Sequence, residues 1–152
     1  VKSAQNMQDA VNSEFETADI IIMAAAVADY RVKNYSTQKM KKGEEDTLTL
    51  ELVKNPDILK NLCEKKMAAS LAKAPIIFGF CAESENLSEN AKTKIQKKGC
   101  DFLVANDISR KDIGFSSEDN EVMILDKNGR ITPLEKAPKT VIARKILEFI
   151  TK

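Results

Sequence analysis

The sequence predicts an α/β domain with a mostly parallel sheet, helices on both faces and an antiparallel hairpin near the carboxyl end. Short continuous apolar runs alternate with amphipathic segments of helical period, a pattern typical of parallel strands joined by right-handed helical crossovers. The Asn128-Gly129 pair lies between two strand-like runs and is the strongest hairpin signal in the chain. The 152 residues, 43% of them hydrophobic, fit one compact domain.

The first elements are a helix and a buried strand. Apolar side chains recur at four-residue intervals over 3–16, which predicts an amphipathic helix with Ser3 as its N-cap. The apolar run 20–27 is continuous and ends just before Asp29, so it predicts a strand buried on both faces of the sheet.

A polar, lysine-bearing stretch follows, and then a second strand and helix. Leucines alternate with polar residues over 47–52, which predicts a half-buried strand at a sheet edge. Asn55, Pro56 and Asp57 form a helix-start pattern, with Asn55 as the cap, and the helix is expected to continue to about residue 72.

The second half contains two strands, two helices and the hairpin. Buried strands are expected at 75–80 and 101–105, separated by a helix that ends at Gly99. The hairpin strands are expected at 121–126 and 131–134. The last helix, over 140–150, is expected to bury Ala143, Ile146, Leu147 and Ile150.

Composition excludes several classes of function. The 24 basic and 23 acidic residues nearly cancel, which argues against nucleic acid or a membrane as the main partner. Three cysteines without CxxC spacing favour a reducing, cytoplasmic setting over a disulfide framework or a zinc knuckle. The absence of histidine removes His-dependent nucleophile machinery and the commonest metal ligand. No protein-bound metal site is therefore predicted.

Polar residues are expected to collect at one rim of the sheet, outside the carboxyl ends of the parallel strands. Strand-end candidates are Asp29, Glu83 and Asn106, and the lysines of 39–42 are expected to join them. Each of these residues is also compatible with helix capping or a solvated loop. The pattern alone leaves both interpretations open.

The remaining candidates also have two interpretations. The segment 55–58 is explained by capping, yet the same geometry offers free backbone N–H groups to an anion. Lys94 and Lys98 fit the solvent-exposed face of a helix. The five glycines are isolated, so the glycine fingerprint of a dinucleotide-dependent oxidoreductase is absent, and so is a Walker loop.

Five motifs follow one another along the chain: AAAVADYR at 24–31, KMKK at 39–42, LVKNPDIL at 52–59, GFCAE at 79–83 and VANDI at 104–108. In order and spacing they resemble the bacterial phosphopantothenoylcysteine synthetase family, the synthetase domain of the bifunctional flavoproteins of coenzyme A biosynthesis. The resemblance covers essentially the whole chain.

The resemblance implies a Rossmann-like, dimeric, Mg²⁺-assisted ligase that couples 4′-phosphopantothenate to cysteine through an acyl-cytidylate made with CTP. It also implies, in many bacteria, fusion to a flavin-dependent decarboxylase. A non-catalytic nucleotide-binding or dimerisation module of the same fold is the alternative. The strand at 47–52 and the flap before it resemble the family's dimerisation element.

Lys39 is the catalytic residue that the resemblance implies, because a cation on a mobile flap can stabilise charge that develops on phosphate or acyl-phosphate oxygens. The residues that would bind the nucleotide, by the same resemblance, are Ala25, Ala26, Asp29, Lys39, Asn55, Pro56, Asp57, Ile58, Phe80, Lys94 and Lys98.

The chain departs from the family in two places. Cys81 and Ser84 replace small residues of the family motif, which leaves the backbone role intact. The family's glycine-rich first strand and its Asn-Arg-Ser-Ser-Gly segment have no counterpart before Val1. A single synthetase-like domain over 1–152 that lacks this amino-terminal segment, and that turns over poorly without it, is therefore expected.

Overall fold

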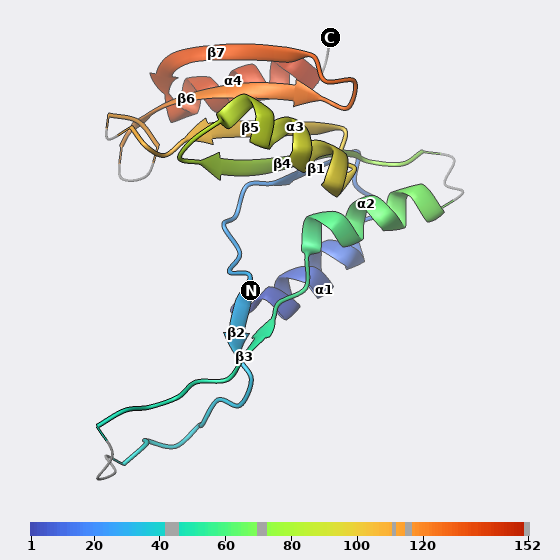
Figure 1. Cartoon of the computed structure of the whole chain (residues 1–152). Helices are drawn as coiled ribbons and strands as arrows, with labels where there is room; N and C mark the ends of the chain where they lie inside the picture. The colour runs from blue at the N-terminus through green and yellow to red at the C-terminus, as the bar shows by residue number, and fades with distance from the viewer. Residues whose placement is uncertain (42–45, 70–72, 111, 115–116, 151–152) are drawn as a thin grey trace.

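The computed structural model describes residues 1–41, 46–69, 73–110, 112–114 and 117–150. Figure 1 shows a body of sheet and helices from which the chain between β1 and α2 projects as a long arm. The elements in order are α1 (Ala4–Glu14), β1 (Ile20–Met23), β2 (Tyr30–Val32), β3 (Leu52–Lys54), α2 (Ile58–Ala68), β4 (Ile76–Glu83), α3 (Leu87–Lys98), β5 (Phe102–Asp107), β6 (Asp119–Asp126), β7 (Ile131–Pro138) and α4 (Lys139–Ile150).

The main sheet has the strand order β1-β4-β5-β6-β7. β1, β4 and β5 run parallel, whereas β6 and β7 add antiparallel strands at the other side. The turn between β6 and β7 contains Gly129 with φ +84°, the left-handed conformation that glycine adopts without strain. The predicted α/β class, the Rossmann-like arrangement and the closing hairpin are confirmed.

Alternate side chains of the central strands enter two separate cores. Ile77 and Leu103 pack with residues of α2 and α3 on one face of the sheet. Their chain neighbours Phe78 and Val104 pack with residues of α4 on the other face. The prediction of helices on both faces is therefore confirmed, and it follows from the two-residue period of strands.

The caps of the first and third helices agree with the sequence. The Ser3 hydroxyl accepts a hydrogen bond from the Asn6 N–H at 3.1 Å, so Ser3 caps α1. Phe15 follows α1, is fully buried, and lies 4.5 Å from the Lys65 ammonium, measured to the ring centroid. Gly99 ends α3 with φ +75°.

The strand predicted over 20–27 is shorter and less buried than expected. β1 ends at Met23, and the alanine-rich residues after it form a loop. Ile21 and Met23 are buried, but Ile20 and Ile22 are each 38% exposed. The prediction of burial on both faces was wrong because β1 is an edge strand of the sheet, where α4 and its core do not reach.

The prediction of a half-buried strand over 47–52 was also wrong. Only Leu52 of that range belongs to a strand, and β3 pairs with β2 in a separate two-stranded ribbon at the base of the arm. Leu48, Leu50 and Leu52 are exposed rather than half-buried. An alternating pattern indicates one apolar face, but it does not say whether the same chain covers that face.

Two helix details differ from the prediction. Asp57, not Asn55, is the N-cap of α2, and the helix ends at Ala68, while 70–72 lie outside the described residues. In α4, Ile146 is buried as expected, but Leu147 is 50% exposed and Ala143 is also exposed. The buried face of α4 contains Ile142 and Ile146, so Ile142 takes the place that was predicted for Ala143.

No helix in the described part of the chain combines the length and the apolar character that crossing a bilayer requires.

Candidate functional site

A cleft of about 650 Å³ opens beside the carboxyl ends of β1 and β4, between the loop after β1, the start of α2 and the end of α3. Ten of the eleven residues expected to bind a nucleotide line this one cleft. They are Ala25, Ala26, Asp29, Asn55, Pro56, Asp57, Ile58, Phe80, Lys94 and Lys98. Segments far apart in the sequence are therefore brought together where α/β sheets usually bind ligands.

Asn55 joins the loop after β1 to the segment before α2. Its side-chain amide donates a hydrogen bond to the Ala28 carbonyl at 2.8 Å, and its backbone N–H donates to the Asp29 carbonyl at 2.7 Å. The Arg31 guanidinium donates to the Lys54 carbonyl at 2.8 Å and to the Asn55 side-chain oxygen at 3.2 Å. These bonds engage both the amide nitrogen and the oxygen of the Asn55 side chain away from α2, where Asp57 is the cap.

Asp57 performs the capping and adds a charge contact. One carboxylate oxygen accepts the Lys60 N–H at 3.1 Å, and the other pairs with the Lys98 ammonium. Burial raises the pKa of Asp57, but the hydrogen bond from Lys98, the Lys60 N–H and both lysine charges outweigh it, so the pKa lies below its usual value. Asp57 therefore stays ionised at neutral pH.

A second recess of about 550 Å³ adjoins the cleft and shares three of its residues. It is lined by Asp57, Lys60, Glu83, Asn90, Thr93, Lys94, Lys97 and Lys98. Four lysines against two carboxylates give the recess a net positive charge, so its electrostatics favour an anion. The start of α2 adds the positive end of a helix dipole.

Gly79 allows α2 to pack closely on β4. A Cβ atom at this position would lie 2.5 Å from Cδ2 of Leu59 and 3.1 Å from Cδ1 of Leu103. Leu59 and Leu103 both line the cleft. The missing side chain of Gly79 thus sets the position of the cleft floor.

The three cysteines are free and poorly suited to nucleophilic chemistry. Burial raises the pKa of Cys81 and of Cys100 to about 11, and that of Cys63 to about 12. Their thiols are protonated at neutral pH, although Cys81 lines the cleft. This agrees with the interpretation of the cysteines as small packing residues.

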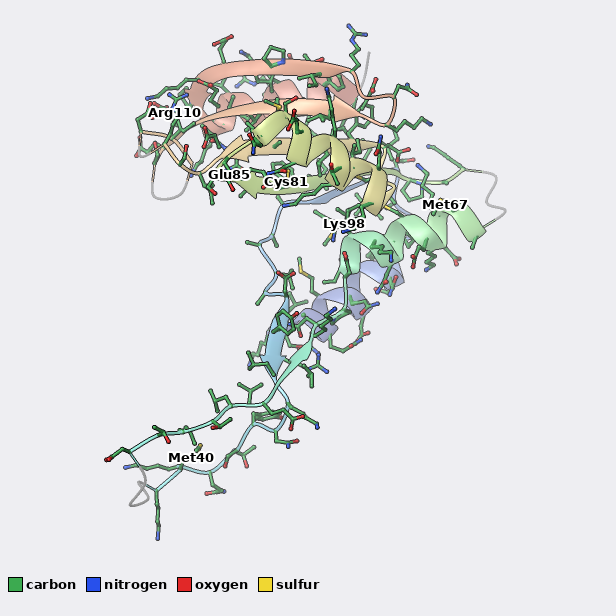
Figure 2. All side chains as sticks on the ribbon, in the orientation of Figure 1. Met40, Met67, Cys81, Glu85, Lys98 and Arg110 are labelled. Atoms are coloured by element: carbon green, nitrogen blue, oxygen red, sulfur yellow. The ribbon has the colours of Figure 1, made fainter. Side chains whose placement is uncertain are left out.

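The expected rim forms only in part. Asp29 lines the cleft and Glu83 lines the recess, but Asn106 lines neither. Lys39 and Lys41 are exposed on the arm, and Lys42 lies outside the described residues. Figure 2 shows Met40, the neighbour of Lys39, far out on the arm, whereas Cys81 and Lys98 lie in the body. The prediction that the lysines of 39–42 share one rim with the strand-end residues does not hold for Lys39 and Lys41, which line neither hollow.

Sequence reasoning missed several residues that line the two hollows. In the cleft these are Met23, Val27, Ala28, Tyr30, Lys54, Leu59, Cys81, Ala82 and Leu103. In the recess they are Lys60, Asn90, Thr93 and Lys97. The recess could have been anticipated from the four-residue spacing of Asn90 and Lys94, which places both on one helix face. In the part of the chain that the structure describes, no three Cys, Asp or Glu side chains converge to hold a metal ion.

The curated relatives of this chain include two bacterial proteins of the same name. The chain is 36% identical over 154 residues to the coenzyme A biosynthesis bifunctional protein CoaBC of Mycobacterium tuberculosis (strain H37Rv), covering 99% of this chain and 37% of that protein. It is 39% identical over 150 residues to the protein of the same name from Bacillus subtilis, covering 99% and 35%. The chain thus spans a little over a third of the length of these relatives.

Comparison with solved structures agrees with the fold. The crystal structure of the C-terminal domain of CoaBC aligns with a TM-score of 0.73 and 33% identity, over 99% of this chain and 62% of that one. A Cab2 mutant in complex with phosphopantothenate-cysteine aligns with a TM-score of 0.56 and 18% identity, over 89% and 45%. The second similarity establishes the fold alone.

The family comparison covers the chain from end to end. All of residues 1–152 match the family described as the DNA/pantothenate metabolism flavoprotein C-terminal domain. The two curated relatives and the crystallised CoaBC domain extend over 99% of the chain as well. The chain belongs to the family of the DNA/pantothenate metabolism flavoprotein C-terminal domain.

Proposed function

We propose that this chain forms most of a ligase domain that joins 4′-phosphopantothenate to cysteine with CTP in coenzyme A biosynthesis. The observation that carries the proposal is the cleft at the carboxyl ends of β1 and β4, where ten candidate nucleotide-binding residues meet. The names of the curated relatives support the pathway, and the ligand in the Cab2 complex supports the product.

The proposed reaction has two steps. The phosphopantothenate carboxylate attacks the α-phosphate of CTP, forming an acyl-cytidylate and releasing pyrophosphate. The cysteine amine then attacks the acyl carbon, an amide forms, and CMP leaves. Both steps develop charge on phosphate oxygens, which positioned cations and backbone N–H groups stabilise.

The lining of the cleft suits a nucleotide. Ala25 and Ala26 leave room beside the end of β1, and Phe80 offers an aromatic surface to the base or ribose. Lys94 and Lys98 project from α3 beside the start of α2, where the helix dipole also favours phosphate. These features support the nucleotide-binding roles proposed for all ten residues.

Lys39 is the proposed catalytic cation, and it lies on the arm rather than in the cleft of its own chain. Exposed apolar side chains follow the arm at Tyr35, Met40, Leu48 and Leu50. We propose that these side chains pair with a second copy in a homodimer, and that dimerisation carries Lys39 to the cleft in which it acts. The support is the amount of apolar surface on the arm.

Mg²⁺ is proposed to arrive with the nucleotide. Asp57 and Glu83 face the recess as carboxylates, and each already pairs with a lysine. Because both carboxylates are already paired, the ion would be held mainly by the phosphates of the nucleotide and by water, which is a common binding mode for Mg²⁺. The ion would neutralise phosphate charge and orient the leaving group.

The proposal extends to the complete protein. Fusion to a flavin-dependent decarboxylase is supported by the name bifunctional protein and by the third of each relative that the chain spans. A reducing cytoplasm is supported by the three free thiols.

A pyrophosphate-release assay on the full-length protein tests the proposal. With CTP, Mg²⁺, 4′-phosphopantothenate and cysteine, we expect turnover that falls by about a hundredfold or more in Lys39→Ala, because a single transition-state cation is removed. Lys41→Ala is the matched control two residues further along the arm and should retain near-native turnover. ATP in place of CTP tests the choice of nucleotide.

Two outcomes would contradict the proposal in different ways. Native turnover in Lys39→Ala would remove the catalytic role of that residue and leave the ligase proposal standing. CTP binding without pyrophosphate release by the native full-length protein would favour the alternative, a non-catalytic nucleotide-binding or dimerisation module.

A further inference from the structure

Glu83 is the last residue of β4, and its carboxylate is held firmly on one side. The Asn90 side-chain amide donates a hydrogen bond to Oε2 of Glu83 at 3.1 Å and another to the Glu85 carbonyl at 3.0 Å. The side chain of Glu83 is only 14% exposed. Its orientation is therefore fixed by the first turn of α3 and the loop before it.

The other oxygen of Glu83 faces Lys94. Oε1 is sealed from solvent and, among the described residues, accepts no hydrogen bond of good geometry. The Lys94 ammonium lies in ion-pair contact with this oxygen. A buried carboxylate oxygen without a counter-charge is costly, so the contact restrains Lys94 as much as it stabilises Glu83.

Lys94 itself has access to both hollows. Its side chain is 43% exposed, and it lines the cleft and the recess. It lies one helical turn after Asn90 on α3, so Asn90, Glu83 and Lys94 form a connected chain from the helix to the cleft. An ammonium has three N–H donors, which lets Lys94 contact Glu83 and an anion at the same time.

We propose that Glu83 is a positioning residue, acting through Lys94, that fixes the ammonium of Lys94 at the phosphate end of the nucleotide cleft. A free lysine side chain loses much rotamer entropy when it is ordered by a ligand. Because the ion pair with Glu83 already orders Lys94 in the free protein, most of that entropy is not lost when the ligand binds. Because Lys94 offsets the charge of Glu83, the carboxylate repels a bound phosphate only weakly.

The pair formed by Lys98 and Asp57 is a useful contrast. Both side chains are exposed to a similar extent, 31% and 42%, and Asp57 also caps α2. Asp57 therefore has a separate structural task, whereas the side chain of Glu83 contacts, among the described residues, the Asn90 amide and the Lys94 ammonium. A change at Glu83 should act mainly through Lys94.

The inference rests on the proposed nucleotide site, and a double-mutant cycle tests it. CTP affinity of the full-length protein is measured by calorimetry with Mg²⁺ for Glu83→Gln, Lys94→Met and the double variant. Glu83→Gln should weaken binding about fivefold to tenfold in the native background and less than about twofold with Lys94→Met present. Glu85→Gln removes a neighbouring carboxylate and should bind CTP like the native protein.

A ligand-independent measurement separates the two proposals. Carbon relaxation of the lysine ε-methylene groups, assigned with Lys94→Met, should show Lys94 ordered in the free protein and as mobile as Lys97 in Glu83→Gln. Equal mobility of Lys94 and Lys97 in the native protein would overturn the role of Glu83. If Glu83→Gln weakens CTP binding equally in the native and the Lys94→Met backgrounds, the role of Glu83 is also overturned, while the proposed nucleotide site still stands. Absence of CTP binding by the native protein would instead overturn the proposed function.

Discussion

The body and the arm of this molecule have similar apolar residues but bury them very differently. In the body, Phe78, Val104 and Leu125 are fully buried in the two cores around the sheet. On the arm, Leu48 and Leu50 are 68% and 56% exposed. The body therefore satisfies its own hydrophobic pattern, whereas the arm presents a pattern that needs another surface to cover it.

The local interactions of the arm are weak. Its ribbon pairs two strands of three residues each, and the ion pair between Lys33 and Glu51 is 2.6 Å long but well exposed. Exposed pairs of this kind contribute about 1 kcal/mol or less, and isolated two-stranded ribbons are marginal in water. Intramolecular packing therefore orders the body, while the arm depends on its anchors and on pairing.

The largest expected effect is a cavity in the body. Phe78 is fully buried and stacks on Phe102 with ring centroids 4.6 Å apart. Phe78→Ala should lower the free energy of unfolding by about 3–5 kcal/mol, measured by urea denaturation. A loss below about 1 kcal/mol would show that the body is not held by its own core.

A charge on the arm should act on association rather than on folding. Leu50→Lys should raise the dissociation constant of the proposed homodimer by about a hundredfold, because two symmetric copies each lose a buried leucine contact. Sedimentation equilibrium measures this change. Thr49→Lys places the same charge on the neighbouring residue of the extended segment and serves as the control. Equal effects of the two changes would argue against an apolar interface along this face.

The smallest effect is expected at the floor of the cleft, where the body borders the arm. Gly79→Ala should cost about 1–2 kcal/mol of unfolding free energy, because its Cβ would displace the Leu59 side chain. Urea denaturation measures the cost, and calorimetry with CTP should show weaker binding. Leu59→Ala in the same protein should relieve the clash and recover part of the CTP affinity. If the double variant binds no better than Gly79→Ala alone, Leu59 is not the residue that transmits the effect.

The sequence was most informative where a residue's role is local. The Ser3 cap, the Gly99 end of α3 and the Gly129 turn depend on a few neighbouring residues, and the structure has all three. Buried strands at β4 and β5 were also predictable, because continuous apolar runs reflect burial on both faces. β4 extends to Glu83, beyond the predicted end of the strand. The extension was missed because the last residues of β4 are small or polar.

The prediction failed where tertiary context decides the outcome. Nothing in the composition of 20–27 distinguishes an edge strand from a central one, so the exposure of Ile20 and Ile22 could not be foreseen. Asn55 has the residue type of a cap, but its side chain forms hydrogen bonds with Ala28 and Arg31, which are distant in the sequence. The cleft was predicted through family resemblance, because its residues meet only after the sheet and α2 are assembled.

The hydrogen bonds of Asn55 link the arm to the cleft. Arg31 belongs to the arm, Asn55 lines the cleft, and a hydrogen bond joins them directly. We therefore expect a shift of β2 and β3 to change the geometry of the cleft, and by linkage we expect a ligand in the cleft to bias the arm by the same coupling free energy. A partner that binds the arm would then act as an effector of the cleft, and a ligand in the cleft would act as an effector of the arm.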